Sequence, residues 1–128
     1  MEERIRFFTH KGQQILLVDL SNCNAAEFAR TTRLVPAYTA TQPRGSVLLL
    51  ADFTGAQIDK TNVEVLKQAT VFDRPHLKRS AWVGVESLPK VFYENIKSFS
   101  RRDLPVFNTR EEALEFLVSD GENMASGQ

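Results

Sequence analysis

The sequence predicts an α/β fold in which a mixed sheet of about five strands is flanked by helices. Short apolar runs suited to buried strands alternate along the chain with segments whose apolar residues recur at helical spacing. The first two strand-like runs follow each other across a Lys-Gly turn, with no helix between them. The expected order is therefore β-β-α-β-α-β-α-β-α, with parallel strands and right-handed crossovers after the first hairpin.

The N-terminal segment is typical of a β-hairpin. Residues 4–10 alternate in polarity, and residues 13–19 contain an apolar block at 15–18 that suits burial on both faces. Lys11 and Gly12 between them are a two-residue turn signal. We therefore expect two antiparallel strands.

A first helix is expected after residues 21–24, which are rich in N-cap residue types. Pro36 lacks a backbone N–H and its ring crowds the preceding turn, so we expect a kink there or a helix end near Leu34. The predicted inner face of this helix comprises Ala25, Phe28, Ala29, Leu34 and Val35.

The middle of the chain predicts a buried strand followed by a helix. Residues 47–51 are wholly apolar, which favours a central strand covered on both faces. The stretch "DFTGAQIDKTNVEVL" at 52–66 then leads into a helix over 60–72. Its predicted inner stripe comprises Val63, Leu66 and Ala69.

Two more strand–helix pairs complete the pattern. Residues 78–85 predict a strand, and a helix starts near Pro89, where a missing N–H does no harm. Residues 104–107 predict a short strand, placed at a sheet edge because of Pro105. The inner stripe of the helix between these strands comprises Phe92, Ile96 and Phe99.

The last predicted helix begins with a capping box. Thr109 is its N-cap and Glu112 is the third helical residue. Its buried stripe comprises Ala113, Leu114, Leu117 and Val118. Residues 1–118 are thus expected to form a single domain, and residues 119–128, which lack core residues, are expected to be a disordered tail.

Charge argues against nucleic-acid binding. The 128 residues carry 16 basic and 16 acidic side chains, and nucleic-acid binding needs a cationic excess. The charge is uneven, because residues 74–102 hold seven basic against two acidic side chains while residues 103–128 hold one against six. A modest anion-binding patch and ordinary solvated helix faces beside an acidic tail both fit this pattern.

Other composition features favour a cytoplasmic protein without a membrane span. Cys23 is the one cysteine, so neither a disulfide framework nor a cysteine-based metal cluster is expected. The charged start is not a secretory signal, and no apolar run approaches the roughly 20 residues of a membrane helix. We predict no metal site built from cysteines and histidines and no cofactor.

The predicted topology sorts the polar residues between the two edges of the sheet. Parallel strands end at one edge, where α/β proteins usually place their sites. The residues expected at this edge are Asp19, Ser21, Asn22, Cys23, Asp52, Thr54, Glu86, Ser87, Asn108 and Thr109. His10, Lys11, Arg74 and His76 are expected at the opposite edge. This separation argues against histidine-dependent catalysis and favours a packing role for Cys23.

Asp19 and Asp52 form a candidate carboxylate pair. Each ends an apolar strand, and one crossover joins the two strands, so their carboxylates could be neighbours. Paired acids at such an edge can hold Mg²⁺, as in a phosphate-handling or receiver-like domain. Alternatively, each aspartate accepts backbone N–H bonds in the turn after its own strand.

With this order of elements, the chain resembles the STAS-like superfamily, and especially the SpoIIAA-like (STAS/SEC14-type) bacterial proteins. The resemblance covers about residues 4–118. It rests on the element order and on the stretches "HKGQQILLVDLSNC", "SVLLLADFTGAQIDKTNVEVL", "AWVGV" and "FNTREEALEFL".

The resemblance implies a non-catalytic regulatory domain that docks a protein partner, such as an anti-sigma-like kinase, through the edge around residues 52–63. STAS domains of this kind have a strand-end aspartate followed by an Asp-Ser-Ser-Gly-like turn whose second serine is phosphorylated. Asp52 is similar to the strand-end aspartate, and Asp59 and Thr61 are similar to the aspartate and phosphorylated serine of the turn. Lys60 and Asn62 differ from the motif. Without the resemblance, Asp59 is an N-cap and Thr61 a first-turn residue.

The SEC14 part of the resemblance implies a second role, that of a lipid- or apolar-ligand-binding module. The aromatic residues that could line a pocket are Phe72, Trp82, Phe92, Tyr93 and Phe99. Aromatic residues at these spacings equally suit an ordinary core.

Overall fold

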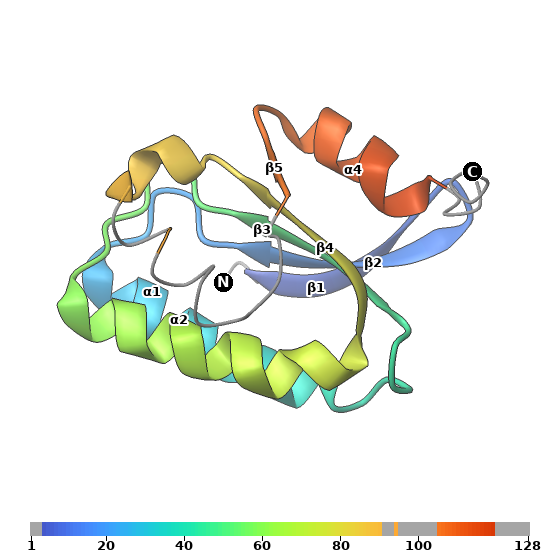
Figure 1. The fold of residues 1–128 in the computed structure, drawn as a ribbon, viewed down its shortest axis with the longest axis horizontal. Helices are drawn as coiled ribbons and strands as arrows, with labels where there is room; N and C mark the ends of the chain where they lie inside the picture. The colour runs from blue at the N-terminus through green and yellow to red at the C-terminus, as the bar shows by residue number, and fades with distance from the viewer. Residues whose placement is uncertain (1–3, 91–93, 95–104, 120–128) are drawn as a thin grey trace.

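The computed structural model describes residues 4–90, 94 and 105–119, and it places five strands and three α-helices in this part of the chain (Figure 1). The strands are β1 (Ile5–His10), β2 (Gln13–Asp19), β3 (Val47–Asp52), β4 (Leu77–Val83) and β5 (Val106–Phe107). The α-helices are α1 (Ala25–Thr39), α2 (Lys60–Asp73) and α4 (Arg110–Val118). The helix predicted to start near Pro89, with Phe92, Ile96 and Phe99 as its inner stripe, falls largely on residues 91–93 and 95–104, which lie outside the described part.

The strands form one mixed sheet in the order β1-β2-β3-β4-β5. β1 pairs with β2 antiparallel, and β2 to β5 are mutually parallel. The α/β class and the five-stranded mixed sheet predicted from the sequence are therefore confirmed. We call the edge at which β2 to β5 end the carboxyl edge.

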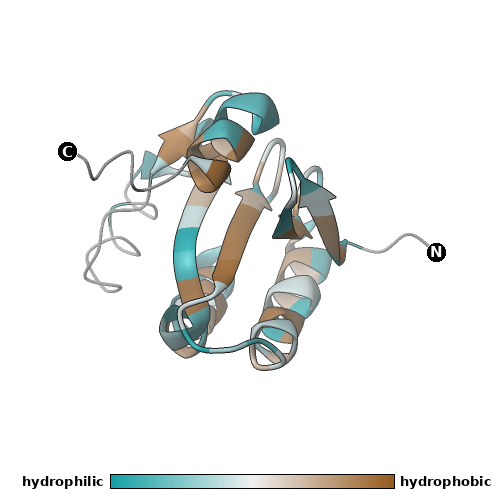
Figure 2. Cartoon of the chain, turned by 90° about the vertical axis from the view of Figure 1, so that its right-hand side faces the viewer, coloured by the Kyte–Doolittle hydropathy of each residue, from teal (hydrophilic) through white to brown (hydrophobic). Residues whose placement is uncertain are grey.

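The sheet separates two hydrophobic layers. In the end-on view of Figure 2, α4 lies above the sheet and α1 and α2 lie below it. Because side chains alternate along a strand, Leu16 and Val18 face α1 and α2, while Ile15 and Leu17 face α4. All six residues of β3 are buried, as expected of a central strand covered on both faces.

Of the two outcomes expected at Pro36, a kink or a helix end near Leu34, the helix end is wrong. The helix continues through Pro36 to Thr39, and the N–H of the C-cap residue Ala40 donates to the carbonyl of Pro36. The inner row of α1 comprises Phe28, Thr31, Thr32, Val35 and Thr39. Leu34 lies outside this row and is 52% exposed, so its assignment to the inner face is also wrong.

Hydrogen bonds hold both ends of α4. At its start, the hydroxyl of Thr109 accepts the N–H of Glu112, while the carboxylate of Glu112 accepts the N–H of Asn108 instead of Thr109. At its end, the guanidinium of Arg79 on β4 donates to the carbonyls of Leu117 and Ser119.

No helix in the described residues is long and apolar enough to span a bilayer.

Candidate functional site

Two turns of the same kind lie side by side at the carboxyl edge. Asp19 and Asp52 are register partners on β2 and β3. Oδ1 of Asp19 accepts bonds from the N–H and the hydroxyl of Ser21, at 3.0 and 2.6 Å. Oδ1 of Asp52 accepts the same pair from Thr54, at 3.0 and 2.7 Å. Each Asp-x-Ser/Thr sequence thus stabilises the turn after its own strand, the structural alternative that we predicted for these aspartates.

Arg110, the first residue of α4, bridges the two carboxylates. Its Nε lies 2.7 Å from Oδ2 of Asp52, and its Nη2 lies 3.3 Å from Oδ1 of Asp19. The Asp52 side chain is 8% exposed, against 27% for Asp19 and 37% for Arg110. The guanidinium therefore occupies the position between the aspartates that a cation would need.

The buried member of this cluster is held in its charged form. Burial by itself would raise the pKa of Asp52, but the two Thr54 bonds and the Arg110 guanidinium outweigh it and the pKa lies below its usual value. Burial would likewise lower the pKa of Arg110, and its bonds to Asp52 and Asp19 raise it instead. The cluster is thus a stable ion triad at neutral pH.

Backbone hydrogen bonds join the loops of the carboxyl edge to one another. The N–H of Asn22 donates to the carbonyl of Thr54 at 2.8 Å, and the N–H of Gln57 donates to the carbonyl of Cys23 at 2.9 Å. Asn22 has a φ of +57° and Gly55 a φ of +70°, and a Cβ at Gly55 would overlap the Asn22 side chain. The loops after β2 and β3 therefore behave as one packed unit.

The start of α2 leaves two predicted residues on the surface. Asp59 is the N-cap, as predicted, because its carboxylate accepts the N–H of Asn62 at 2.9 Å. The buried Asn62 amide donates to the carbonyl of Ala25, which ties α2 to α1. Lys60 and Thr61 between them are exposed.

The remaining predicted residues divide as follows. Cys23 is fully buried, and burial raises the pKa of its thiol, which suits a packing residue better than a nucleophile. Glu86 lies exposed in the 3-10 turn Val85–Ser87 after β4. His10 and His76 lie at the other edge of the sheet, where Nδ1 of His76 lies 3.0 Å from the carbonyl of Gln42.

A cluster of metal-binding side chains does not occur among the described residues, in which no three His, Cys, Asp or Glu side chains come together. At the carboxyl edge the two aspartates share Arg110, so a Mg²⁺ ion would have to displace a guanidinium held by both carboxylates. The geometry gives no positive support to the receiver-like alternative.

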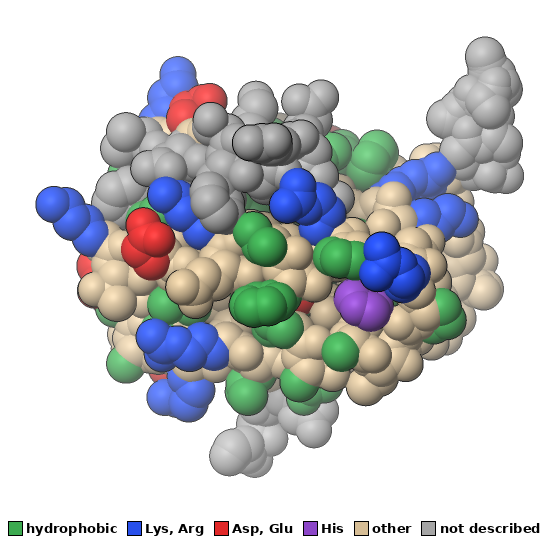
Figure 3. Space-filling model, turned by 60° about the horizontal axis from the view of Figure 1, so that its bottom comes forward, with side chains coloured by type: hydrophobic (Ala, Val, Ile, Leu, Met, Phe, Trp, Pro, Cys, Tyr) green, Lys and Arg blue, Asp and Glu red, His purple; other side chains and the backbone are tan. Residues whose placement is uncertain are grey.

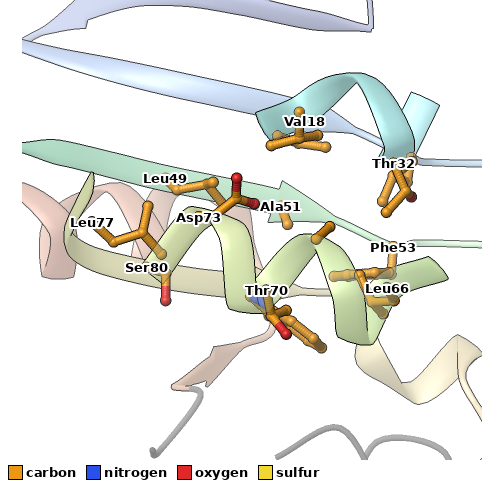
Figure 4. Close-up of a pocket in the computed structure, with 14 residues that line it drawn as sticks. Val18, Thr32, Leu49, Ala51, Phe53, Leu66, Thr70, Asp73, Leu77 and Ser80 are labelled. Carbon is orange, nitrogen blue, oxygen red and sulfur yellow. The ribbon is translucent and has the colours of Figure 1, made fainter. Parts of the chain in front are cut away.

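The structure contains a small cavity between the sheet and the two helices α1 and α2. Figure 4 shows its lining, in which Val18, Leu49 and Ala51 come from the sheet and Leu66 and Thr70 from α2. Its volume is about 50 Å³. A cavity of about 150 Å³ holds benzene, so this one has room for a few water molecules and not for a lipid chain.

Of the aromatic residues predicted to line a pocket, Trp82 contributes to this cavity. Phe72 does not line this cavity; it is 64% exposed and lines a separate surface groove with Arg33 and Pro36. Phe92, Tyr93 and Phe99 lie outside the described residues.

Sequence reasoning missed the two arginines of the site. Arg110 is the one basic residue in an acidic segment and directly follows an N-cap at a strand end, which is the signal that could have identified it. Arg4 donates to the carbonyls of Asp19 and Ser21, both at 3.1 Å, and so fixes the loop after β2 from the other side.

Comparison with known proteins adds no relative: no family model, curated protein or solved structure matches the chain.

Proposed function

We propose that the chain is a non-catalytic regulatory domain of the STAS kind, which docks a protein partner through the carboxyl edge around residues 52–63. The observation that carries this proposal is the exposure of Lys60 and Thr61 on a support that is held from several sides. Asp59 caps α2 below them, and the preceding loop is fixed to the loop after β2. A partner would therefore meet a preformed surface.

Thr61 suits a phosphate acceptor in this scheme. It is the second residue of a 14-residue helix, whose dipole and free N–H groups favour an anion at that end. A phosphate would add about 1.5–2 negative charges to this surface, beside Lys60. Because the Thr61 side chain is exposed, the change alters what a partner meets without disturbing the core.

The engagement of the acidic residues favours docking over catalysis. The carboxylate of Asp52 is bound by Thr54 and Arg110, and the carboxylate of Asp19 is bound by Ser21 and Arg110. A general base or metal ligand needs a carboxylate oxygen that can reach a substrate or an ion. The small cavity likewise gives the lipid-binding alternative no support.

The test compares partner recovery by three forms of the tagged protein: the wild type, Thr61→Glu and the control Thr9→Glu. Thr9 is an exposed threonine on β1 at the opposite edge, so the control adds the same charge to a distant surface. We expect at least one cellular protein that binds the wild type and the control and whose recovery falls about tenfold with Thr61→Glu.

A second readout follows the modification itself. After incubation of the wild type with cell extract and ATP, peptide mass spectrometry should find phosphate on Thr61. Equal recovery of every partner by all three forms, together with an unmodified Thr61, would refute the proposed function. Urea unfolding of each form checks that the fold is intact.

A further inference from the structure

A groove runs along the outer surface where α1 meets α2. Arg33 and Pro36 of α1 form one side, and Val65, Gln68, Ala69 and Phe72 of α2 form the floor and the other side. Its volume is about 280 Å³, against about 50 Å³ for the cavity between the sheet and the two helices. We call it the α1/α2 groove.

The groove has an apolar floor beneath a protruding aromatic side chain. Val65 and Ala69 are buried at 7% and 6% exposure, while Phe72 is 64% exposed. A phenyl ring left in water forgoes a large hydrophobic contribution unless another surface covers it. Phe72 is therefore the natural anchor of an interface.

The charged side chain that lines the groove is basic. It is Arg33, and Arg30 lies one turn before it on α1; both are exposed, and neither enters an ion pair among the described residues. The acidic Glu64, one turn before Gln68 on α2, is paired with Lys67 at 3.5 Å. In the space-filling view of this face, hydrophobic side chains gather near the centre, and most of the charged side chains visible around them are Lys and Arg, with some Asp or Glu among them (Figure 3). A complementary surface would carry apolar side chains flanked by carboxylates.

The spacing of the groove residues suits a helix as its occupant. Its floor and wall residues on α2 follow one another at helical spacing, from Val65 through Ala69 to Phe72. They extend over seven residues, which is about 10 Å along the axis. A partner helix with apolar residues at i, i+4 and i+7 matches this length and spacing. A flat bilayer would touch the protruding Phe72 and Arg33 but would not reach the recessed floor.

We propose that the α1/α2 groove binds an acidic amphipathic helix of a partner protein, with Phe72 as apolar anchor and Arg33 as the residue that selects acidic flanks. The inference deepens the proposed function, since it rests on the partner being a protein and names the segment that docks. Thr61 precedes Val65 by four residues on α2, so the candidate phosphate would lie near one end of this groove.

The probe for this proposal is a synthetic amphipathic peptide of about five helical turns, with Leu at i, i+4 and i+7 and Glu on both flanks. A matched peptide carries Lys in place of every Glu. Fluorescence anisotropy measures the affinity of each labelled peptide for the full chain, and amide chemical shifts identify the surface that responds.

We expect the acidic peptide to bind more tightly than the basic one and to shift amides of α1 and α2. Phe72→Ala should weaken its binding about tenfold, and Arg33→Glu should remove or reverse the preference for acidic flanks. Leu34→Ala and Arg6→Glu are the controls, since both residues are exposed and do not line the groove; they should leave binding unchanged.

Three results would overturn the proposal. If the two peptides bind equally well, or if neither binds, the proposed preference of the groove for a helix with acidic flanks is wrong. Binding to vesicles of phosphatidylcholine and phosphatidylglycerol that depends on Phe72 would assign the groove to a membrane surface. Self-association in sedimentation that Phe72→Ala abolishes would assign it to a second copy. If the acidic peptide binds as expected while Thr61→Glu leaves partner recovery unchanged, the helix-binding role of the groove is supported and the proposed phosphorylation switch at Thr61 is refuted.

Discussion

At the scale of single residues, Arg110 turns the two strand-end aspartates from a candidate metal site into an ion triad. The sequence placed Asp19 and Asp52 at one sheet edge, and their positions follow from strand direction alone. Their shared cation could not be predicted, because it arrives from a residue 58 positions after Asp52 and depends on how β5 leads into α4. Sequence patterns report local periodicity, whereas an ion triad is a product of tertiary placement.

The lowered pKa of Asp52 predicts a pH dependence of stability. A carboxylate whose pKa is lower in the folded than in the unfolded protein stabilises the fold above its unfolded pKa, about 3.9, and this contribution is lost as the pH falls through the folded value. Asp52→Asn should therefore reduce the free energy of unfolding by about 1–3 kcal/mol at neutral pH and by less at about pH 3, where this group is already largely protonated in the unfolded chain.

Urea unfolding at both pH values measures this difference. Glu111→Gln serves as the control, since Glu111 is an exposed carboxylate in the same helix as Arg110. A stability gap between wild type and Asp52→Asn that is as large in acid as at neutral pH would contradict the stabilising role of the charged form.

At the scale of elements, local sequence signals predicted where the helices begin better than where α1 ends. Asp59 and Thr109 make the N-cap bonds expected of them, and the cap of α1 is Asn24, within the predicted stretch 21–24, because capping is decided within four residues. The end of α1 was mispredicted because burial of Val35 and Thr39 offsets the hydrogen bond lost at Pro36. Thr39 also gives a hydroxyl bond to the buried carboxylate of Asp73, which fixes the end of α1 against α2.

The loops of the carboxyl edge depend on Gly84. It has a φ of +77°, and a Cβ there would lie 2.5 Å from the N and 2.7 Å from the Cα of Thr54. Gly84→Ala should therefore destabilise the fold by clearly more than the roughly 1–2 kcal/mol of a left-handed alanine, since the backbone of the Asp52 turn has to move.

Gly45→Ala isolates the conformational part of this effect. Gly45 has a similar φ of +68°, and a Cβ there would meet no atom within 4 Å. Thermal unfolding should show a distinctly larger loss of stability for Gly84→Ala than for Gly45→Ala; equal losses would mean that the contact with Thr54 is unimportant.

At the scale of the whole molecule, the sheet is stable only when both faces are covered. The upper face, with Ile15, Leu17 and Leu50, is covered in the described structure by α4, a helix of nine residues. The strand pattern predicted this two-sided burial, since an apolar run without alternation needs a cover on each side. It could not reveal that the outer side of α2 keeps Phe72 exposed, because a helical stripe does not indicate where a partner is missing.

Leu117 tests how far the fold depends on this cover. It is fully buried against the upper face, so Leu117→Ala should lower the free energy of unfolding by about 2–5 kcal/mol through lost burial and a cavity. Leu34→Ala, at a 52% exposed position, should change it little. Denaturant melts followed by Trp82 fluorescence compare the two, and similar effects would show that α4 contributes little to the core.

The bridge made by Arg110 also sets an order of events during synthesis. A ribosome completes Asp19 and Asp52 well before the residue that neutralises them, so the nascent chain carries two uncompensated carboxylates at neighbouring strand ends until α4 emerges. The two turns after β2 and β3 therefore acquire their shared cation only after residue 110 has been translated. A protein that recognises the bridged form of this edge would not bind nascent chains that lack Arg110.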